Sequence, residues 1–260
     1  IGWHRHEMLG GYTRAVVAGF LRTAAGNWTG RPMPKGGLLL ALVVMWALPR
    51  LGLPVAAYAP PWLAWALAAL DAAFPLAVAI ALLGALWPAR SFRNFGFVPL
   101  LALLALANAA LHLEALGAIA PERGVGAAAI RLPLDLIVLI IVVMGGRVIP
   151  FFTDRALPEA GVRRYAMADR AAVGLVALLV LADQLTLPAQ EVGVIALLAA
   201  AANGWRMAGW RSLATGPRPI LWVLHLAYGW IVAGLALKGL APFAPAAILE
   251  AKGVYYGLPP

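Results

Sequence analysis

The four histidines and the complete absence of cysteine define which metal chemistry this chain can carry out. His4 and His6 lie in the run Trp-His-Arg-His-Glu-Met at residues 3–8, whereas His112 and His225 each lie inside a long apolar stretch. Imidazole is the usual axial ligand of haem and a common ligand of copper. Without cysteine, disulfides, thiolate metal sites and cysteine nucleophiles are excluded, so a transition metal would need histidine, methionine or carboxylate ligands.

Each histidine also has a structural interpretation. A single histidine in an apolar helix often bridges two helices by a hydrogen bond or lies at the lipid headgroups, and both alternatives stay open for His4, His112 and His225. His112 has Asn108 one helical turn away on the same face. For His6 we favour a ligand or cavity role, because a His-X-His-Glu run at the start of an apolar helix is hard to explain as lipid-facing.

Carboxylates and arginines inside apolar stretches are costly in lipid and are therefore candidates for function. Asp71 and Arg14 lie deep in two of these stretches, and we expect them to pair with each other or to line a cavity. Arg131 and Asp135 are four residues apart and can neutralise each other across one helical turn. A second hypothesis follows, a proton- or ion-coupled transporter that uses Asp71, Asp135 and Arg14, although we find no internal repeat of the kind common in transporters.

These residues belong to a chain that is too apolar for a water-exposed surface. Of its 260 residues, 63% are hydrophobic and 12% are charged, whereas about a quarter of a soluble domain is charged. Long Ala- and Leu-rich runs favour helices over the alternating strands of a barrel. We therefore predict an all-α, polytopic transmembrane bundle with about eight spans, near residues 6–25, 37–53, 61–87, 95–116, 126–148, 170–187, 189–207 and 218–240.

The charged residues alternate between the predicted connections. The basic connections contain Arg31, Lys35, Arg90, Arg93, Arg147, Arg155, Arg163, Arg164, Arg170, Arg206, Arg211 and Arg218, whereas the others contain only Arg50, Glu122 with Arg123, and Glu191. The positive-inside rule places the basic connections in the cytoplasm and the start of the chain outside. We therefore assign the net charge of +9 to orientation in the membrane and expect no nucleic-acid partner.

Two further segments are more polar than a loop requires, residues 27–32 and residues 145–153. The second begins Gly145-Gly146-Arg147, and we expect it to end the fifth span. Paired glycines let a backbone or a flat ligand approach closely, and Arg147 could contact an anionic group such as a haem propionate. The alternative is a helix end broken by glycine and proline, with Arg147 anchored at the membrane interface.

These segments carry a resemblance to a known family. Residues 3–8, Ala-Gly-Phe-Leu at 18–21 and Asn-Trp-Thr-Gly at 27–30 closely resemble the opening motif of the NnrS family. Further similarities follow at Arg93-Asn94, at residues 145–153, and around His225, in Leu221-Trp222, Leu226 and Tyr228. Arg22 departs from the pattern, since we expect an apolar residue at its position.

The resemblance implies a multi-pass protein of the bacterial inner membrane that contains haem and copper. It also implies a role in denitrification and in resistance to nitric oxide and nitrosative stress. Because such proteins typically have about twelve spans, we expect residues 1–260 to be a single transmembrane domain that is incomplete at both ends. The family's ligands do not transfer directly, so the candidates are His6, His112, His225 and Arg147 for cofactor binding and His4, His6, His112 and His225 for metal.

Overall fold

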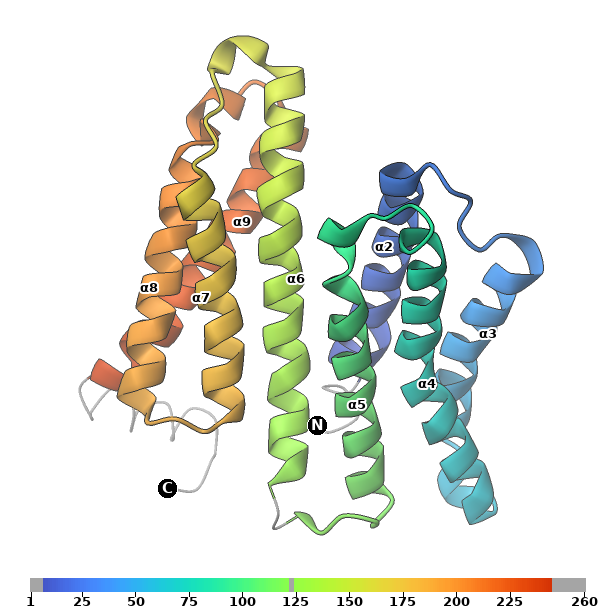
Figure 1. Ribbon diagram of the computed structural model, residues 1–260. Coiled ribbons are helices and arrows are strands. Elements are labelled where there is room, and N and C mark those ends of the chain that lie inside the picture. The colour runs from blue at the N-terminus through green and yellow to red at the C-terminus, as the bar shows by residue number, and fades with distance from the viewer. Residues whose placement is uncertain (1–6, 122–123, 245–260) are drawn as a thin grey trace. The chain divides into compact units, whose positions relative to one another are not determined.

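The computed structural model describes residues 7–121 and 124–244, and all of its regular elements in these ranges are helices (Figure 1). His4 and His6 lie outside the described residues. The all-α fold class is confirmed. The α-helices are α2 (Thr13–Thr29), α3 (Gly36–Gly52), α4 (Pro61–Leu86), α5 (Phe97–Ala115), α6 (Val125–Ala156), α7 (Ala166–Gln184), α8 (Ala189–Ala208) and α9 (Pro219–Leu240). A π-helical turn, η1 (Glu7–Tyr12), leads into α2.

Four of these helices are long and apolar enough to cross a membrane. They are α4, α5 together with the short helix η3 (Phe92–Asn94) before it, α6, and α9 with the turn that follows it. Helix α3 is also apolar but shorter. Large apolar side chains point away from the protein on several of these helices, and Ile80 of α4 is 71% exposed. Such a surface is suited to lipid rather than to water.

Helix α6 differs from its predicted span. We expected the fifth span to end near Val148, but the helix runs for 32 residues, to Ala156, and contains both glycines and Pro150. Helical glycines and prolines are tolerated in membrane proteins because neighbouring helices pack against them and satisfy backbone groups. Here Gly145 lies against the ring of Tyr228, and Gly146 lies against the guanidinium of Arg206. The prediction of a broken helix end at this point is therefore wrong.

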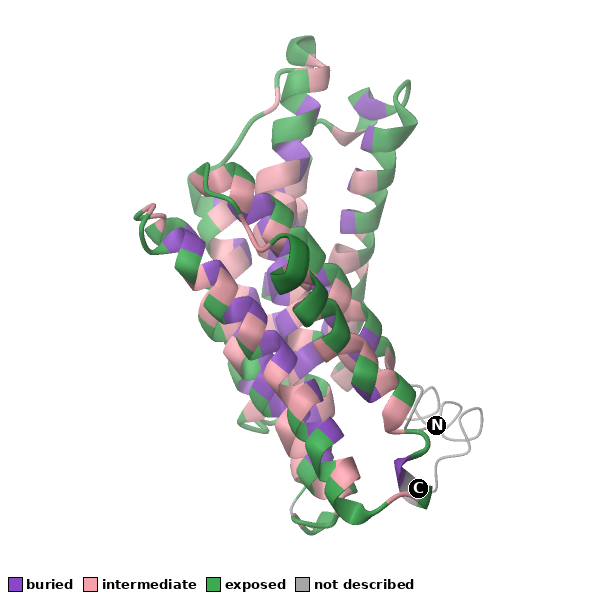
Figure 2. Cartoon of the chain, turned by 90° about the vertical axis from the view of Figure 1, so that its right-hand side faces the viewer, coloured by how far each residue is buried: buried purple, intermediate pink, exposed green. Residues whose placement is uncertain are grey.

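The chain divides into two compact units, Ile1–Leu136 and Ile137–Pro260, which we call unit 1 and unit 2. In unit 1, helix α4 packs against α2, α3 and α5. In unit 2, helix α8 packs against both α7 and α9. Buried and exposed positions alternate along the helices, so a helix has one side in the protein interior and another at its surface (Figure 2). Each unit buries its own cluster of polar side chains.

Candidate functional site

Asp71 is the centre of the polar cluster in unit 1. Its side chain is 0% exposed, and its carboxylate accepts hydrogen bonds from four side chains. The Oδ2 atom lies 3.1 Å from Arg14 Nη2, 2.8 Å from Asn108 Nδ2 and 2.9 Å from His112 Nε2. The Oδ1 atom lies 2.5 Å from Arg50 Nη1. The predicted Arg14–Asp71 pair is therefore confirmed, and it belongs to a larger network that we call the Asp71 cluster, formed by Asp71, Arg14, Arg50, Asn108 and His112.

Helical spacing brings these side chains together. Asn108 and His112 are four residues apart on α5, so both face α4. Arg14 lies in the first turn of α2 and Arg50 in the last turn of α3. Both arginines also donate to the carbonyl of Gly10 in the π-helical turn η1. Arg14 donates through Nε, and Arg50 Nη2 lies 3.1 Å from the carbonyl oxygen. The two arginines thus connect the turn η1 to the Asp71 cluster.

The charges of the Asp71 cluster nearly balance. Glu7 Oε2 lies 3.5 Å from Arg50 Nε, so two carboxylates face the two guanidinium groups of Arg14 and Arg50. Buried charges in a protein are tolerated when they are paired and hydrogen-bonded. The carboxylates of Asp71 and Glu7 thus balance the charges of Arg14 and Arg50. The cluster can therefore hold His112 in a fixed orientation with Nε2 directed at a carboxylate.

That orientation has a chemical consequence. A histidine that binds a metal usually donates its second ring N–H to a carboxylate or a carbonyl, which fixes the tautomer and makes the ligating nitrogen more basic. The contact of His112 with Asp71 has this form, because an ionised carboxylate only accepts hydrogen bonds. A metal bound by His112 would therefore be held through Nδ1.

A second cluster lies in unit 2 around Arg206 of α8, which is 3% exposed. Arg206 Nη2 donates to the carbonyl of Val142 at 2.8 Å, to Asn203 Oδ1 at 3.2 Å and to the Tyr228 hydroxyl. The Tyr228 hydroxyl in turn donates to Asn203 Oδ1. Asp169 Oδ1 lies 3.6 Å from Arg206 Nη1 and supplies the opposite charge. We call Arg206, Asn203, Tyr228 and Asp169 the Arg206 cluster.

His225 lies beside the Arg206 cluster, with its ring against Trp210. Its Nε2 atom is 2.9 Å from Thr153 Oγ1, and its Nδ1 atom is 2.8 Å from Ser212 Oγ. Thr153 already donates its hydroxyl proton to the carbonyl of Ile149, so it accepts from Nε2–H of His225. Nδ1 then accepts from Ser212. Both ring nitrogens of His225 are therefore occupied by hydroxyl groups of its own unit.

The predicted site residues are thus distributed over different parts of the chain. His112 lies in the Asp71 cluster of unit 1, whereas His225 lies in unit 2. Arg147 is half-buried on α6. His4 and His6 cannot be placed, because they lie outside the described residues. Within residues 7–121 and 124–244, no group of three or more histidine, aspartate or glutamate side chains could hold a metal ion.

Two arginines, Arg50 and Arg206, were not identified from the sequence as members of buried polar clusters. Arg50 and Arg206 are counted there as charges of connections, but each lies in the last turn of a helix and is directed into the protein. Their spacing from aromatic residues is the signal that could have identified them. Arg50 is four residues from Trp46, Arg206 is four from Trp210, and each guanidinium lies over the corresponding ring.

Apolar helices that expose large side chains outward and bury arginine-rich clusters inside define a helical membrane protein. A family model described as NnrS protein matches residues 1–255 of the chain. The protein therefore belongs to the NnrS family. Comparison with curated proteins finds no matching relative, and comparison with solved structures finds no match either.

Proposed function

We propose that this protein is a multi-pass protein of the bacterial inner membrane that binds haem and copper and acts in the response to nitric oxide and nitrosative stress and in denitrification. Membership of the NnrS family supports the proposal. The single structural observation that carries it is the hydrogen bond between His112 and the fully buried Asp71. This is the arrangement by which proteins orient a histidine that binds a metal.

The donor set of unit 1 fits the proposed cofactors better than that of unit 2. We assign His112 as one ligand and His6, the histidine of the opening His-X-His-Glu run, as its partner. His4 is the candidate for a further copper ligand. Bound haem iron and copper would each supply a centre that takes up nitric oxide or a single electron. The residues of the chain hold and orient these groups.

His225 already uses both ring nitrogens in hydrogen bonds. It could bind a metal only by giving up its hydrogen bond with Ser212 or with Thr153. The pairing of both ring nitrogens supports a role in which His225 connects α9 to α6 and to the residues after α8. Arg147 belongs to unit 2 and stays a separate candidate for binding an anionic group such as a haem propionate, since it is the basic residue of the Gly-Gly-Arg segment.

The proposal is tested by a pyridine haemochrome spectrum and elemental analysis of the full-length protein purified in detergent. We expect a haem spectrum and copper in a constant ratio to protein. A preparation with the expected helix content that contains neither haem nor copper, even after expression with both supplied, would contradict the proposal.

The buried Asp71 also favours a second candidate function, proton- or ion-coupled transport with Arg14 and Asp135. A carboxylate that takes up and releases a proton has to exchange its hydrogen-bond partners, and Asp71 would have to release at least one of four donors. Proton flux into proteoliposomes, followed with a pH-sensitive dye under an imposed membrane potential, tests this candidate. Flux that is lost in Asp71→Asn would support it, and flux equal to that of empty liposomes would exclude it.

A further inference from the structure

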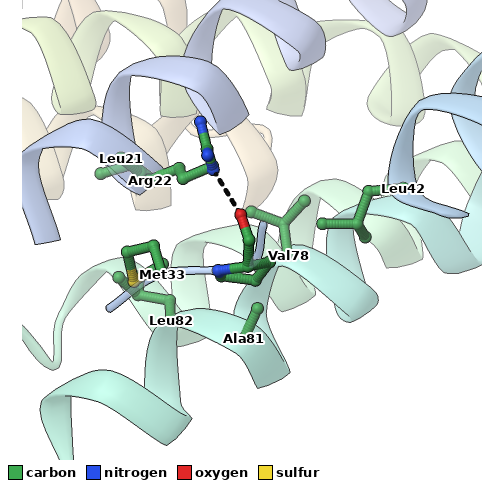
Figure 3. Close-up of a pocket in the computed structure, with 8 residues that line it drawn as sticks. Leu21, Arg22, Met33, Leu42, Val78, Ala81 and Leu82 are labelled. Atoms are coloured by element: carbon green, nitrogen blue, oxygen red, sulfur yellow. Dashed lines mark hydrogen bonds between the residues drawn. The ribbon is translucent and has the colours of Figure 1, made fainter. Parts of the chain in front are cut away.

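An apolar hollow lies beside an arginine at the end of unit 1 where α2 and α4 finish (Figure 3). Its volume is about 250 Å³, including space that is open to the surroundings. The walls come from α2, α3, α4 and the connection between α2 and α3, and the side chains that matter here are Leu21, Arg22, Met33, Leu42, Val78 and Leu82. Most of this space is open to the surroundings, and Leu21 and Leu82 on the walls are 0% and 1% exposed, so the enclosed part has room for about one methyl or methylene group.

Arg22 is the charged residue at this hollow, and it stands where the family pattern leads us to expect an apolar side chain. Its Nε atom donates to the carbonyl of Pro34 at 3.0 Å, as the dashed line in Figure 3 shows. That bond fixes the guanidinium at the α2–α3 connection. No other hydrogen bond or ion pair of Arg22 occurs among the described residues. The terminal amino groups of Arg22 are thus available to an anion from outside the protein.

The end of unit 1 that carries the hollow is basic. The α2–α3 connection contains Arg31 and Lys35, both exposed, and the connection between α4 and α5 contains Arg90 and Arg93. The two connections lie at the same end, because Trp28 stacks on Phe97 with ring centroids 5.7 Å apart. The sequence has no acidic residue between Glu7 and Asp71 and none between Asp71 and Glu114. The positive charge at this end is therefore not balanced by carboxylates of the same connections.

Aromatic side chains locate this end at a membrane interface. Trp87 and Phe92 are exposed in the connection between α4 and α5, while Tyr58 and Trp62 are exposed at the opposite end of α4. Tryptophan and tyrosine gather at the headgroup level of both membrane surfaces. Arg22 lies seven residues before the end of α2, which is about 10 Å along a helix. An arginine at that depth can extend its guanidinium to the headgroups while its stem stays among apolar groups.

We propose that this hollow is a binding site for one anionic phospholipid. The phosphodiester contacts the terminal amino groups of Arg22 and the side chains of Arg31 and Lys35. One acyl chain lies along the open side of the hollow, against the partly exposed Met33 and Leu42. Basic pockets between membrane helices on the cytoplasmic side bind anionic headgroups for the same electrostatic reason. The positive-inside orientation predicted above places this end of unit 1 in the leaflet where such lipids concentrate.

Native mass spectrometry of the full-length protein in detergent tests this site, with phosphatidylglycerol and phosphatidylcholine of equal chain length as probes. We expect one phosphatidylglycerol to bind more tightly than phosphatidylcholine. Arg22→Gln should weaken phosphatidylglycerol binding by about fivefold, which corresponds to one basic residue at a membrane surface. Arg22→Lys keeps the charge and should retain most of the binding. Ala81→Phe places a ring in the hollow and should weaken the binding of phosphatidylglycerol even with Arg22 intact.

Arg90→Gln is the matched control, because it removes one positive charge from the same end of unit 1 but does not line the hollow. Equal loss of binding in Arg22→Gln and Arg90→Gln would overturn the proposal, since it would indicate diffuse surface charge. Equal affinity for both lipids would also overturn it. Full competition by millimolar inorganic phosphate would indicate a free-phosphate site instead. Unchanged binding in Ala81→Phe would refute the acyl-chain part of the site.

Discussion

His112 of α5 and Asp71 of α4 are joined by a hydrogen bond of 2.9 Å between Nε2 and Oδ2, inside a cluster that also contains Arg14 and Arg50. The relationship gives one histidine of the chain a fixed tautomer and a fixed direction. It also makes the carboxylate the common partner of two cations. Consequences for stability and for cofactor content can therefore be tested by changing a few side chains.

Asp71→Asn should destabilise the protein strongly. The substitution keeps the shape of the side chain but leaves Arg14 as a buried cation without its carboxylate and leaves Arg50 with Glu7 alone. Breaking a buried ion pair on one side costs about 3–5 kcal/mol. Thermal unfolding in detergent, followed by circular dichroism, should show a large fall in the midpoint. An unchanged midpoint would mean that the two arginines find other partners.

Asp183→Asn is the control for that substitution, because Asp183 pairs with Lys238 near the ends of α7 and α9. The lysine side chain is 38% exposed, so solvent screens the charge that remains. Exposed ion pairs contribute about 0–1 kcal/mol. We therefore expect a small shift of the unfolding midpoint. A shift as large as that of Asp71→Asn would show that the method reports carboxylate loss in general.

Tyr228→Phe should destabilise unit 2 because it removes a hydroxyl that both accepts from Arg206 and donates to Asn203. The aromatic ring stays in place against Trp210, so the change isolates the polar contacts. Leaving a buried polar group without its partner costs about 1–3 kcal/mol. The same thermal unfolding assay measures the effect. If Tyr228→Phe unfolded at the same temperature as the wild-type protein, the hydrogen bonds of Tyr228 with Arg206 and Asn203 would be contradicted.

Gly146→Ala should destabilise the protein through Arg206. A Cβ atom at Gly146 would overlap the Arg206 guanidinium, which then has to shift and weaken its bond to the carbonyl of Val142. Overpacking of a protein interior costs about 1–3 kcal/mol, of which the higher helix propensity of alanine offsets about 1 kcal/mol. Gly174→Ala on α7 is the matched control, since nothing lies within 4 Å of its Cβ position. Alanine favours a helix over glycine by about 1 kcal/mol, so Gly174→Ala should keep or raise the unfolding midpoint.

The sequence was sufficient for the helices because their signal is local. Long apolar runs bounded by proline, glycine and charges predicted helices near those observed, from α3 to α9. The largest error concerns Gly145, Gly146 and Pro150, where local propensity indicates a helix end. Packing against Tyr228 and Arg206 continues the helix through this segment instead. Arg206 and Tyr228 lie about sixty residues or more from these glycines in the sequence, so local propensity could not indicate the contacts.

The candidate site was only partly predictable for the same reason. The pairing of Arg14 with Asp71 was expected because a buried charge in an apolar helix needs a partner. Arg50 and Arg206 were assigned to connections, because a charge next to the end of an apolar run is normally solvated. Their burial depends on a carboxylate or a hydroxyl that another helix supplies. Spacing within one helix contains no such information.

We propose His112, held by Asp71, as a ligand of the bound haem or copper. The most direct measurement is the haem and copper content per mole of full-length protein for His112→Ala beside His225→Ala. We expect His112→Ala to lose haem or copper while His225→Ala retains both, with helix content unchanged in each. Wild-type content of both cofactors in His112→Ala would contradict the assignment of His112 and the proposed role of the Asp71 cluster.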